Sequence, residues 1–99
     1  MPIGSLMEWP AGDHTTAVYD AVSQTMGVRE NPPEGCLVHA AGFAEDGTWR
    51  VFDVWESMGH LERFERERLF PAIQAVADMP GGGPPSRTER YELHGFMMP

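Results

Sequence analysis

A histidine and an aspartate, His39 and Asp53, each lie in the middle of an otherwise apolar segment. An aspartate that holds an imidazole supports general acid–base catalysis, because histidine titrates near neutral pH. A buried aspartate is costly unless it is paired or protonated, so His39 is its expected partner. Such a pair can also do no more than fix the register of a sheet. The two residues are therefore either catalytic or structural.

The turn between the two segments decides whether these side chains meet. A three-residue loop at residues 45–47, with Gly47 at positive φ, places His39 opposite Asp53. A two-residue turn would instead set Ala40 against Asp53 and send His39 to the side covered by helices. We favour the first register because it leaves the helix-covered face almost free of polar groups. That face would carry Cys36, Val38, Ala40, Gly42, Phe52 and Val54, and the other would carry Leu37, His39, Ala41, Phe43, Val51, Asp53 and Trp55.

The elements around these residues alternate in a regular order. Strands are expected at Ile3–Trp9, Cys36–Phe43, 48–56 and 90–97. A first helix, capped by Asp13, Thr15 or Thr16, carries an apolar stripe and ends near Gly27. A second helix begins after Ser57 and is expected to kink or break near Pro71. This order predicts one α+β domain over residues 1–99, with the ferredoxin-like βαββαβ fold: a four-stranded antiparallel sheet with two helices on one face.

The strand at residues 48–56 is apolar on both faces. One face carries Trp49, Val51 and Trp55, and the other carries Phe52 and Val54. A face left in water should alternate with polar residues, and large aromatic side chains rarely form an exposed patch on a monomer. We therefore expect a homodimer in which a second copy covers the tryptophan-bearing face. The alternative is that the last strand or the Gly- and Pro-rich segment folds over it.

A pocket on that face would be lined by aromatic and apolar side chains. We expect substrate contacts from Trp55, Trp49, Phe43, Val51, Tyr19 and His94, with His39 and Asp53 as the catalytic residues. The strand pattern does not decide which face His94 or Glu8 occupies. No tight ligand spacing links the histidines and carboxylates, so we expect neither a metal nor another cofactor.

Composition excludes several classes of function. The formal net charge is −8, so we expect no nucleic-acid partner. No stretch approaches the length of a membrane span, and the N-terminus does not resemble a signal peptide. Cys36 is the only cysteine, which rules out an internal disulfide and a cysteine zinc cluster. We therefore expect a cytoplasmic protein without a membrane partner.

Several segments resemble small actinobacterial proteins of the dimeric α/β-barrel superfamily. They are 7–10 (MEWP), 32–35 (PPEG) with His39, 51–57 (VFDVWES), and Phe64 with 67–71 (ERLFP). The resemblance implies a homodimer whose two sheets face each other. The step from Trp55 to Ser57 resembles the antibiotic biosynthesis monooxygenase branch, which acts on aromatic polyketides without a metal or flavin. By this resemblance Trp55 lines the pocket.

Three hypotheses for function follow. The first is a cofactor-independent enzyme, similar to a monooxygenase, cyclase or isomerase, acting on a small apolar or aromatic metabolite. The second is a non-catalytic protein that binds such a metabolite in the same pocket. The third is a structural dimer whose aromatic residues are only interface core.

Overall fold

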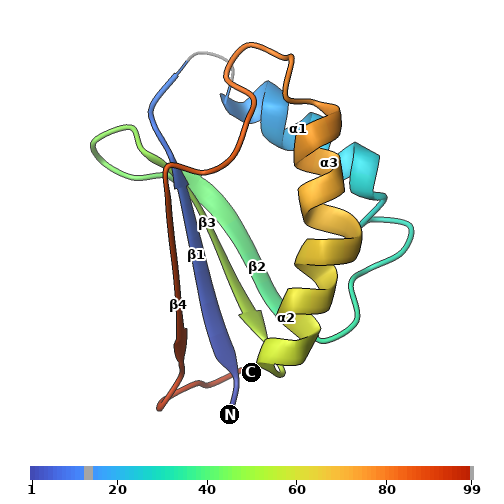
Figure 1. Ribbon diagram of the computed structural model, residues 1–99. Helices are drawn as coiled ribbons and strands as arrows, with labels where there is room; N and C mark the ends of the chain where they lie inside the picture. The colour runs from blue at the N-terminus through green and yellow to red at the C-terminus, as the bar shows by residue number, and fades with distance from the viewer. Residues whose placement is uncertain (13–14, 99) are drawn as a thin grey trace.

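The computed structural model describes residues 1–12 and 15–98, and its strands form one antiparallel sheet. The strands are β1 (Ile3–Trp9), β2 (Cys36–Phe43), β3 (Trp49–Trp55) and β4 (Arg87–Glu92), in the order β2-β3-β1-β4. Helix α1 (Thr15–Met26) and a long helix built from α2 (Met58–Phe64), η1 (Glu65–Leu69) and α3 (Phe70–Ala75) lie on one side of this sheet (Figure 1). The predicted ferredoxin-like fold is confirmed.

The register between β2 and β3 is the one expected from a three-residue loop. Gly47 has a φ of 89°, a conformation that suits glycine, and His39 pairs with Asp53. A β-bulge between Cys36 and Val38 then shifts the pairing, so that Cys36 lies opposite Trp55. The bulge turns Cys36 to the same face as Trp55, and the prediction that Cys36 lies on the other face is wrong.

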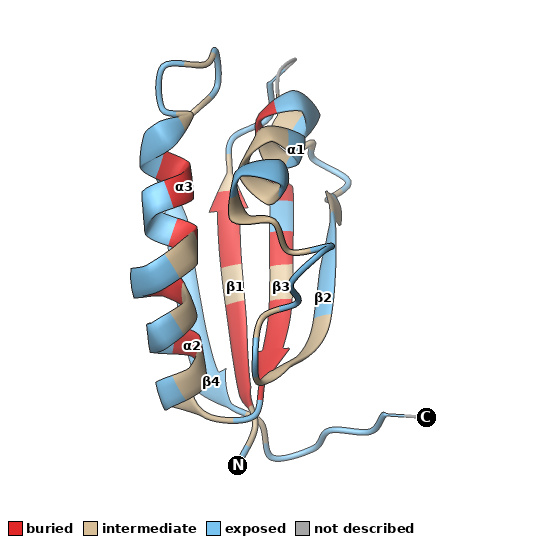
Figure 2. Ribbon diagram, turned by 90° about the vertical axis from the view of Figure 1, so that its right-hand side faces the viewer, coloured by how far each residue is buried: buried red, intermediate tan, exposed pale blue. Residues whose placement is uncertain are grey.

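The helices cover the face that was expected to meet a partner subunit. Met7, Trp49 and Val51 pack with Leu69 and Ile73 in one core cluster. Ile3 and Trp55 pack with Leu61 in a second. The prediction that a second copy covers the tryptophans is therefore wrong, because the chain's own helices do so. Strands β1 and β3, which carry these residues, are red along most of their length in Figure 2, where red marks buried residues.

The long helix contains a π-helical segment where a kink was expected. Ser57 caps α2 by accepting a hydrogen bond from the backbone N–H of His60, as predicted. The segment η1 then inserts its wider turn just before Pro71, and the apolar stripe changes phase there. Pro71 comes directly after this π-helical turn, which interrupts the regular ladder of hydrogen bonds at the point where proline has no N–H to donate. The axis therefore continues to Ala75 instead of breaking.

The ends of the other elements follow from local contacts. Helix α1 ends at Met26, and Gly27 follows with a φ of 66°, as predicted. Arg68 donates a hydrogen bond of 2.7 Å to the Met26 carbonyl, which ties this end of α1 to the long helix. Asp13, one of the expected caps, lies outside the described residues.

Strand β4 spans Arg87–Glu92, so the predicted range of 90–97 was too late in the chain. In the described part of the chain, no helix is both long enough and apolar enough to cross a membrane.

Candidate active site

A cavity of about 260 Å³ lies between α1, the long helix and the sheet. Helix α1 packs mainly against α3 and η1, which leaves space between its inner face and the strands. The lining is largely aromatic and aliphatic. It includes Met7, Trp9, Val18, Val22, Met26, Trp49, Val51, Trp55, Phe64, Leu69, Ile73 and Val76, together with the polar residues Tyr19, His39 and Asp53. Cavities for drug-sized ligands measure about 300–1,000 Å³, so this one suits a small molecule.

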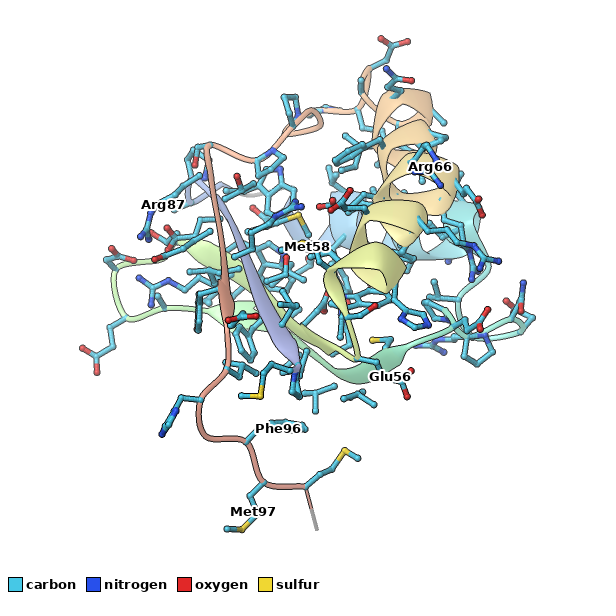
Figure 3. The ribbon with its side chains drawn as sticks, turned by 60° about the horizontal axis from the view of Figure 1, so that its bottom comes forward. Glu56, Met58, Arg66, Arg87, Phe96 and Met97 are labelled. Atoms are coloured by element: carbon cyan, nitrogen blue, oxygen red, sulfur yellow. The ribbon has the colours of Figure 1, made fainter. Side chains whose placement is uncertain are left out.

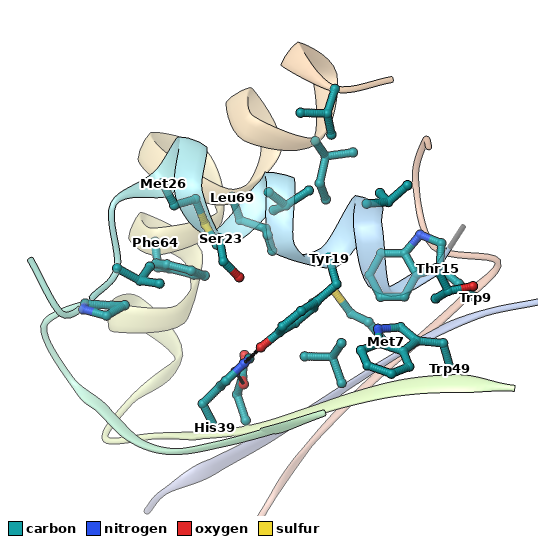
Figure 4. A pocket seen from close by; sticks show the side chains of 18 of the residues that line it. Met7, Trp9, Thr15, Tyr19, Ser23, Met26, His39, Trp49, Phe64 and Leu69 are labelled. Atoms are coloured by element: carbon teal, nitrogen blue, oxygen red, sulfur yellow. Dashed lines mark hydrogen bonds and ion pairs between the residues drawn. The ribbon is translucent and has the colours of Figure 1, made fainter. Parts of the chain in front are cut away.

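Three polar side chains form one hydrogen-bonded chain at the wall of this cavity. Nδ1 of His39 lies 2.5 Å from Oδ1 of Asp53, and Nε2 of His39 is hydrogen-bonded to the hydroxyl of Tyr19. Figure 4 shows the Tyr19 ring reaching from α1 down to His39 on the strand below. The residues therefore link helix α1 to strands β2 and β3 across the space that they enclose.

The environments of these residues differ in a way that sets their charges. Asp53 is 4% exposed, while the His39 side chain on edge strand β2 is 45% exposed. The hydrogen bond that His39 donates to Asp53 raises the pKa of His39, because the carboxylate stabilises the imidazolium. Burial raises the pKa of Tyr19, which therefore stays a neutral phenol. Protons reach His39 from solvent, and Asp53 fixes the orientation of its ring.

Aromatic contacts hold Tyr19 in place. Its ring lies end to end with that of His39 and nearly parallel to it, with 5.9 Å between centroids, and meets the edge of Trp49 at 5.4 Å. Phe43 packs on Trp49 at 4.8 Å and is itself 55% exposed. Edge-to-face pairs of this kind are favourable beyond the area that they bury. The four rings therefore form a continuous aromatic wall from the cavity to the exposed end of β2.

A second polar group in the lining has no partner. Trp55 is only 1% exposed, and its Nε1 atom makes no hydrogen bond among the described residues. Buried N–H groups nearly always find an acceptor, and an exception needs an explanation. Cys36, another lining residue, has a pKa raised to about 11 by burial, so its thiol stays protonated.

The structure brings most of the predicted site residues together. His39, Asp53, Tyr19, Trp49, Val51 and Trp55 all line the cavity, and Phe43 packs behind Trp49. His94 is exposed in the segment after β4, outside the lining. That segment also carries the exposed residues Phe96 and Met97, which lie apart from the helices in Figure 3. The bond between Tyr19 and His39 was not anticipated, because a helical stripe does not show which strand its residues will meet.

Glu8 lies on the face of the sheet away from the helices. Arg87 donates to one of its carboxylate oxygens at 2.9 Å and Arg50 to the other at 2.6 Å. These two guanidinium groups lower the pKa of Glu8. Glu8 is thus a member of an ion-pair cluster, separate from the cavity. Among the residues that the structure describes, no three His, Cys, Asp or Glu side chains converge as metal ligands would.

Comparison with known proteins identifies the architecture. No family model and no curated protein matches the sequence. A solved protein of unknown function from Nitrosomonas europaea superposes with a TM-score of 0.75 at 19% identity, covering 99% of this chain and 94% of that one. A Streptomyces coelicolor monooxygenase in complex with nanaomycin D superposes at 0.69 with 22% identity, covering 98% and 91%. This chain has the fold of the antibiotic biosynthesis monooxygenases.

A further structure with this fold is SnoaB from Streptomyces nogalater, described as a cofactor-independent oxygenase. It superposes at a TM-score of 0.69 with 9% identity, covering 97% of this chain and 96% of that one. The resemblance noted in the sequence is confirmed at the level of the fold. One fold hosts many reactions, so the function must be argued from the residues of the cavity.

Proposed function

We propose that this protein is an oxygenase that acts on a small aromatic metabolite in the cavity beneath α1 and needs no added cofactor. The observation that carries this proposal is the hydrogen-bonded chain of Tyr19, His39 and Asp53 at the wall of an aromatic cavity. Aromatic side chains bind a flat apolar molecule, and a tuned imidazole beside them can move a proton. The fold it shares with two solved oxygenases supports the same assignment.

The lining also indicates what kind of substrate fits. Among the described residues that line the cavity there is no lysine or arginine to bind a phosphate or carboxylate. The polar side chains are few: Tyr19, His39 and Asp53 form one hydrogen-bonded group, and Thr15 and Ser23 add hydroxyls from α1. The best match is a compact fused-ring molecule with one or two hydroxyl or carbonyl groups.

Oxygenation suits such a substrate because an electron-rich phenol can itself reduce oxygen. Loss of the phenolic proton raises the electron density of the ring, and one O₂ then converts the phenol to a quinone and water. In this scheme the proton reaches Nε2 of His39 through the Tyr19 hydroxyl, and Asp53 stabilises the imidazolium that forms. Cyclisation or isomerisation would use the same proton transfers, and the product separates these reactions from oxygenation.

We also propose that the protein is a homodimer, formed through the sheet face that the helices leave open. Strand alternation places Leu6 and Phe52, both only partly buried, on this face, beside the cluster of Glu8, Arg50 and Arg87. An apolar centre with a charged rim is typical of a protein interface. The dimer predicted from the sequence is thus retained, but with the opposite face as its interface.

The test is oxygen uptake with hydroxynaphthalenes and hydroxyanthracenes, with the products analysed by mass spectrometry under ¹⁸O₂. We expect one labelled oxygen atom in the product, and a rate at least tenfold lower for Asp53→Asn. The control is Asp78→Asn, an exposed position outside the cavity. Equal rates for Asp53→Asn and the wild type would refute the proposed roles of His39 and Asp53. Tight binding with no chemical change would favour a metabolite-binding protein instead.

A further inference from the structure

Both ring nitrogens of His39 are already engaged. Nδ1 is hydrogen-bonded to Asp53 at 2.5 Å, and Nε2 is hydrogen-bonded to the hydroxyl of Tyr19. A ligand in the cavity therefore has no free nitrogen of His39 to contact while this arrangement holds. Tyr19 also lines the cavity, and its hydroxyl oxygen has capacity for more than one hydrogen bond. The group that meets the ligand is thus the phenol, with the imidazole behind it.

We propose that Tyr19 is the residue that contacts the ligand's polar atom, and that protonation of His39 switches the Tyr19 hydroxyl from hydrogen-bond acceptor to donor. This inference concerns the site of the proposed function, but it predicts ligand binding and does not require turnover. It also changes the role of two residues. His39 and Asp53 become positioning residues that act through Tyr19.

The switch follows from counting protons along the hydrogen-bonded chain. The buried Asp53 carboxylate accepts from Nδ1–H, so a neutral His39 has its lone pair at Nε2. The Tyr19 O–H must then donate to Nε2, which leaves only oxygen lone pairs to face the cavity. When His39 takes one proton from water at Nε2, that N–H donates to the Tyr19 oxygen instead. The phenolic hydrogen is then released to donate to a ligand.

The surroundings of the switch move its transition to higher pH than that of a free imidazole. His39 exchanges protons with solvent because its side chain is 45% exposed. Asp53 on β3 raises the pKa of His39 above the ordinary imidazole value, and the neighbouring Cys36 thiol on β2 stays neutral. Asp20 on α1 and Arg29 after it act on Tyr19 with opposite signs. Tyr19 therefore keeps its proton while His39 titrates.

Calorimetric binding of two probes of similar size tests this inference. The probes are 1-tetralone, whose carbonyl only accepts hydrogen bonds, and 1-naphthol, whose hydroxyl can donate. Between pH 5.5 and pH 8 we expect the affinity of 1-tetralone to fall relative to that of 1-naphthol by about tenfold or more. In Tyr19→Phe, which keeps the ring but loses the hydroxyl, the ratio should not depend on pH. His39→Gln should abolish the dependence as well.

Three results would overturn the inference. They are a pH-independent ratio in the wild type, the same pH dependence in folded Tyr19→Phe, and no binding of either probe at millimolar concentration. Oxygen uptake is measured separately on the same variants. A working switch without oxygen uptake would contradict the proposed oxygenase and leave the inference standing. Oxygen uptake without a pH-dependent switch would support the proposed oxygenase and overturn the inference about Tyr19.

Discussion

His39 and Asp53 face each other across β2 and β3 with 2.5 Å between Nδ1 and Oδ1, although one is exposed and the other buried. The imidazole ring of His39 thus contacts solvent on one side and the buried Asp53 carboxylate on the other. Because Asp53 raises the pKa of His39, the protonated pair is favoured in the folded state more than in the unfolded chain. The contribution of the pair to stability must therefore depend on pH.

The first prediction concerns that dependence. The folded-state pKa of His39 lies above its unfolded value of about 6.5. The resulting stabilisation is fully present below about pH 6.5 and is lost as the pH rises through the folded pKa. Asp53→Asn should lower the His39 pKa measured by NMR. It should also cost more free energy of unfolding at pH 5.5 than at pH 9. An equal cost at both values would contradict the ion pair.

Much of the fold could be predicted from turns and alternation, but the identity of the covered face could not. Gly47 fixed the register, because a positive φ at that position selects the three-residue loop. Alternation with period two shows which residues share a face, and it does not show where the helices will lie. The prediction that the helices cover the more apolar face of β2 and β3 was wrong, because a cavity as well as a packed core lies beneath α1. That cavity accommodates Asp53 on the covered face of the sheet and Tyr19 on α1 opposite it.

The second prediction concerns the ion pair that joins β4 to the π-helical segment. Arg90 donates to Glu65 at 2.5 Å, and the Glu65 side chain is only 7% exposed. Removal of the arginine leaves a buried carboxylate without its partner, a loss that typically costs several kcal/mol. Because Arg90 is itself 34% exposed, we expect Arg90→Ala to lower the free energy of unfolding by about 2–4 kcal/mol in urea titrations.

The control for this pair is Arg63→Ala. Arg63 forms exposed ion pairs with Glu34 and Glu67, and such surface pairs contribute about 0–1 kcal/mol. The same urea titration applied to both variants separates burial from charge. If Arg90→Ala costs no more than Arg63→Ala, then the Glu65 pair does not anchor β4 to the long helix.

The third prediction fills the cavity. Val22 lines it from α1, so Val22→Phe should place a larger ring in the open space. We expect unchanged or slightly higher thermal stability together with loss of 1-naphthol binding, since an empty apolar space is itself unfavourable. Gln24→Phe, on the exposed side of the same helix, is the matched control and should bind normally. Normal binding by folded Val22→Phe would place the ligand elsewhere.

The fourth prediction concerns the open face of the sheet. Phe52 pairs with Leu6 on β1 and Ala40 on β2, in the centre of that face. Phe52→Arg places a charge where the second copy is proposed to pack, so the dimer dissociation constant should rise at least a hundredfold in sedimentation equilibrium. Gln74→Arg, exposed on α3, should leave it unchanged. A monomeric wild type at micromolar concentration would refute the proposed dimer.

The candidate site was only partly visible in the sequence. His39, Asp53 and Trp55 could be selected because polar or aromatic residues stand out in apolar strands. The partner of His39 on α1 could not, because contact between a helix and a strand depends on a crossing angle that no local pattern encodes. The bulge at Leu37 was also hidden, since no turn residue marks it. These long-range details decide which groups face the cavity.

A crystal structure of the protein with bound 1-naphthol tests the central claim most directly. We expect the naphthalene ring between α1 and the sheet, against Trp49 and Val51, with its hydroxyl within hydrogen-bond distance of the Tyr19 oxygen. A ligand found on the open face of the sheet, or in the cavity with its hydroxyl turned away from Tyr19, would contradict that claim.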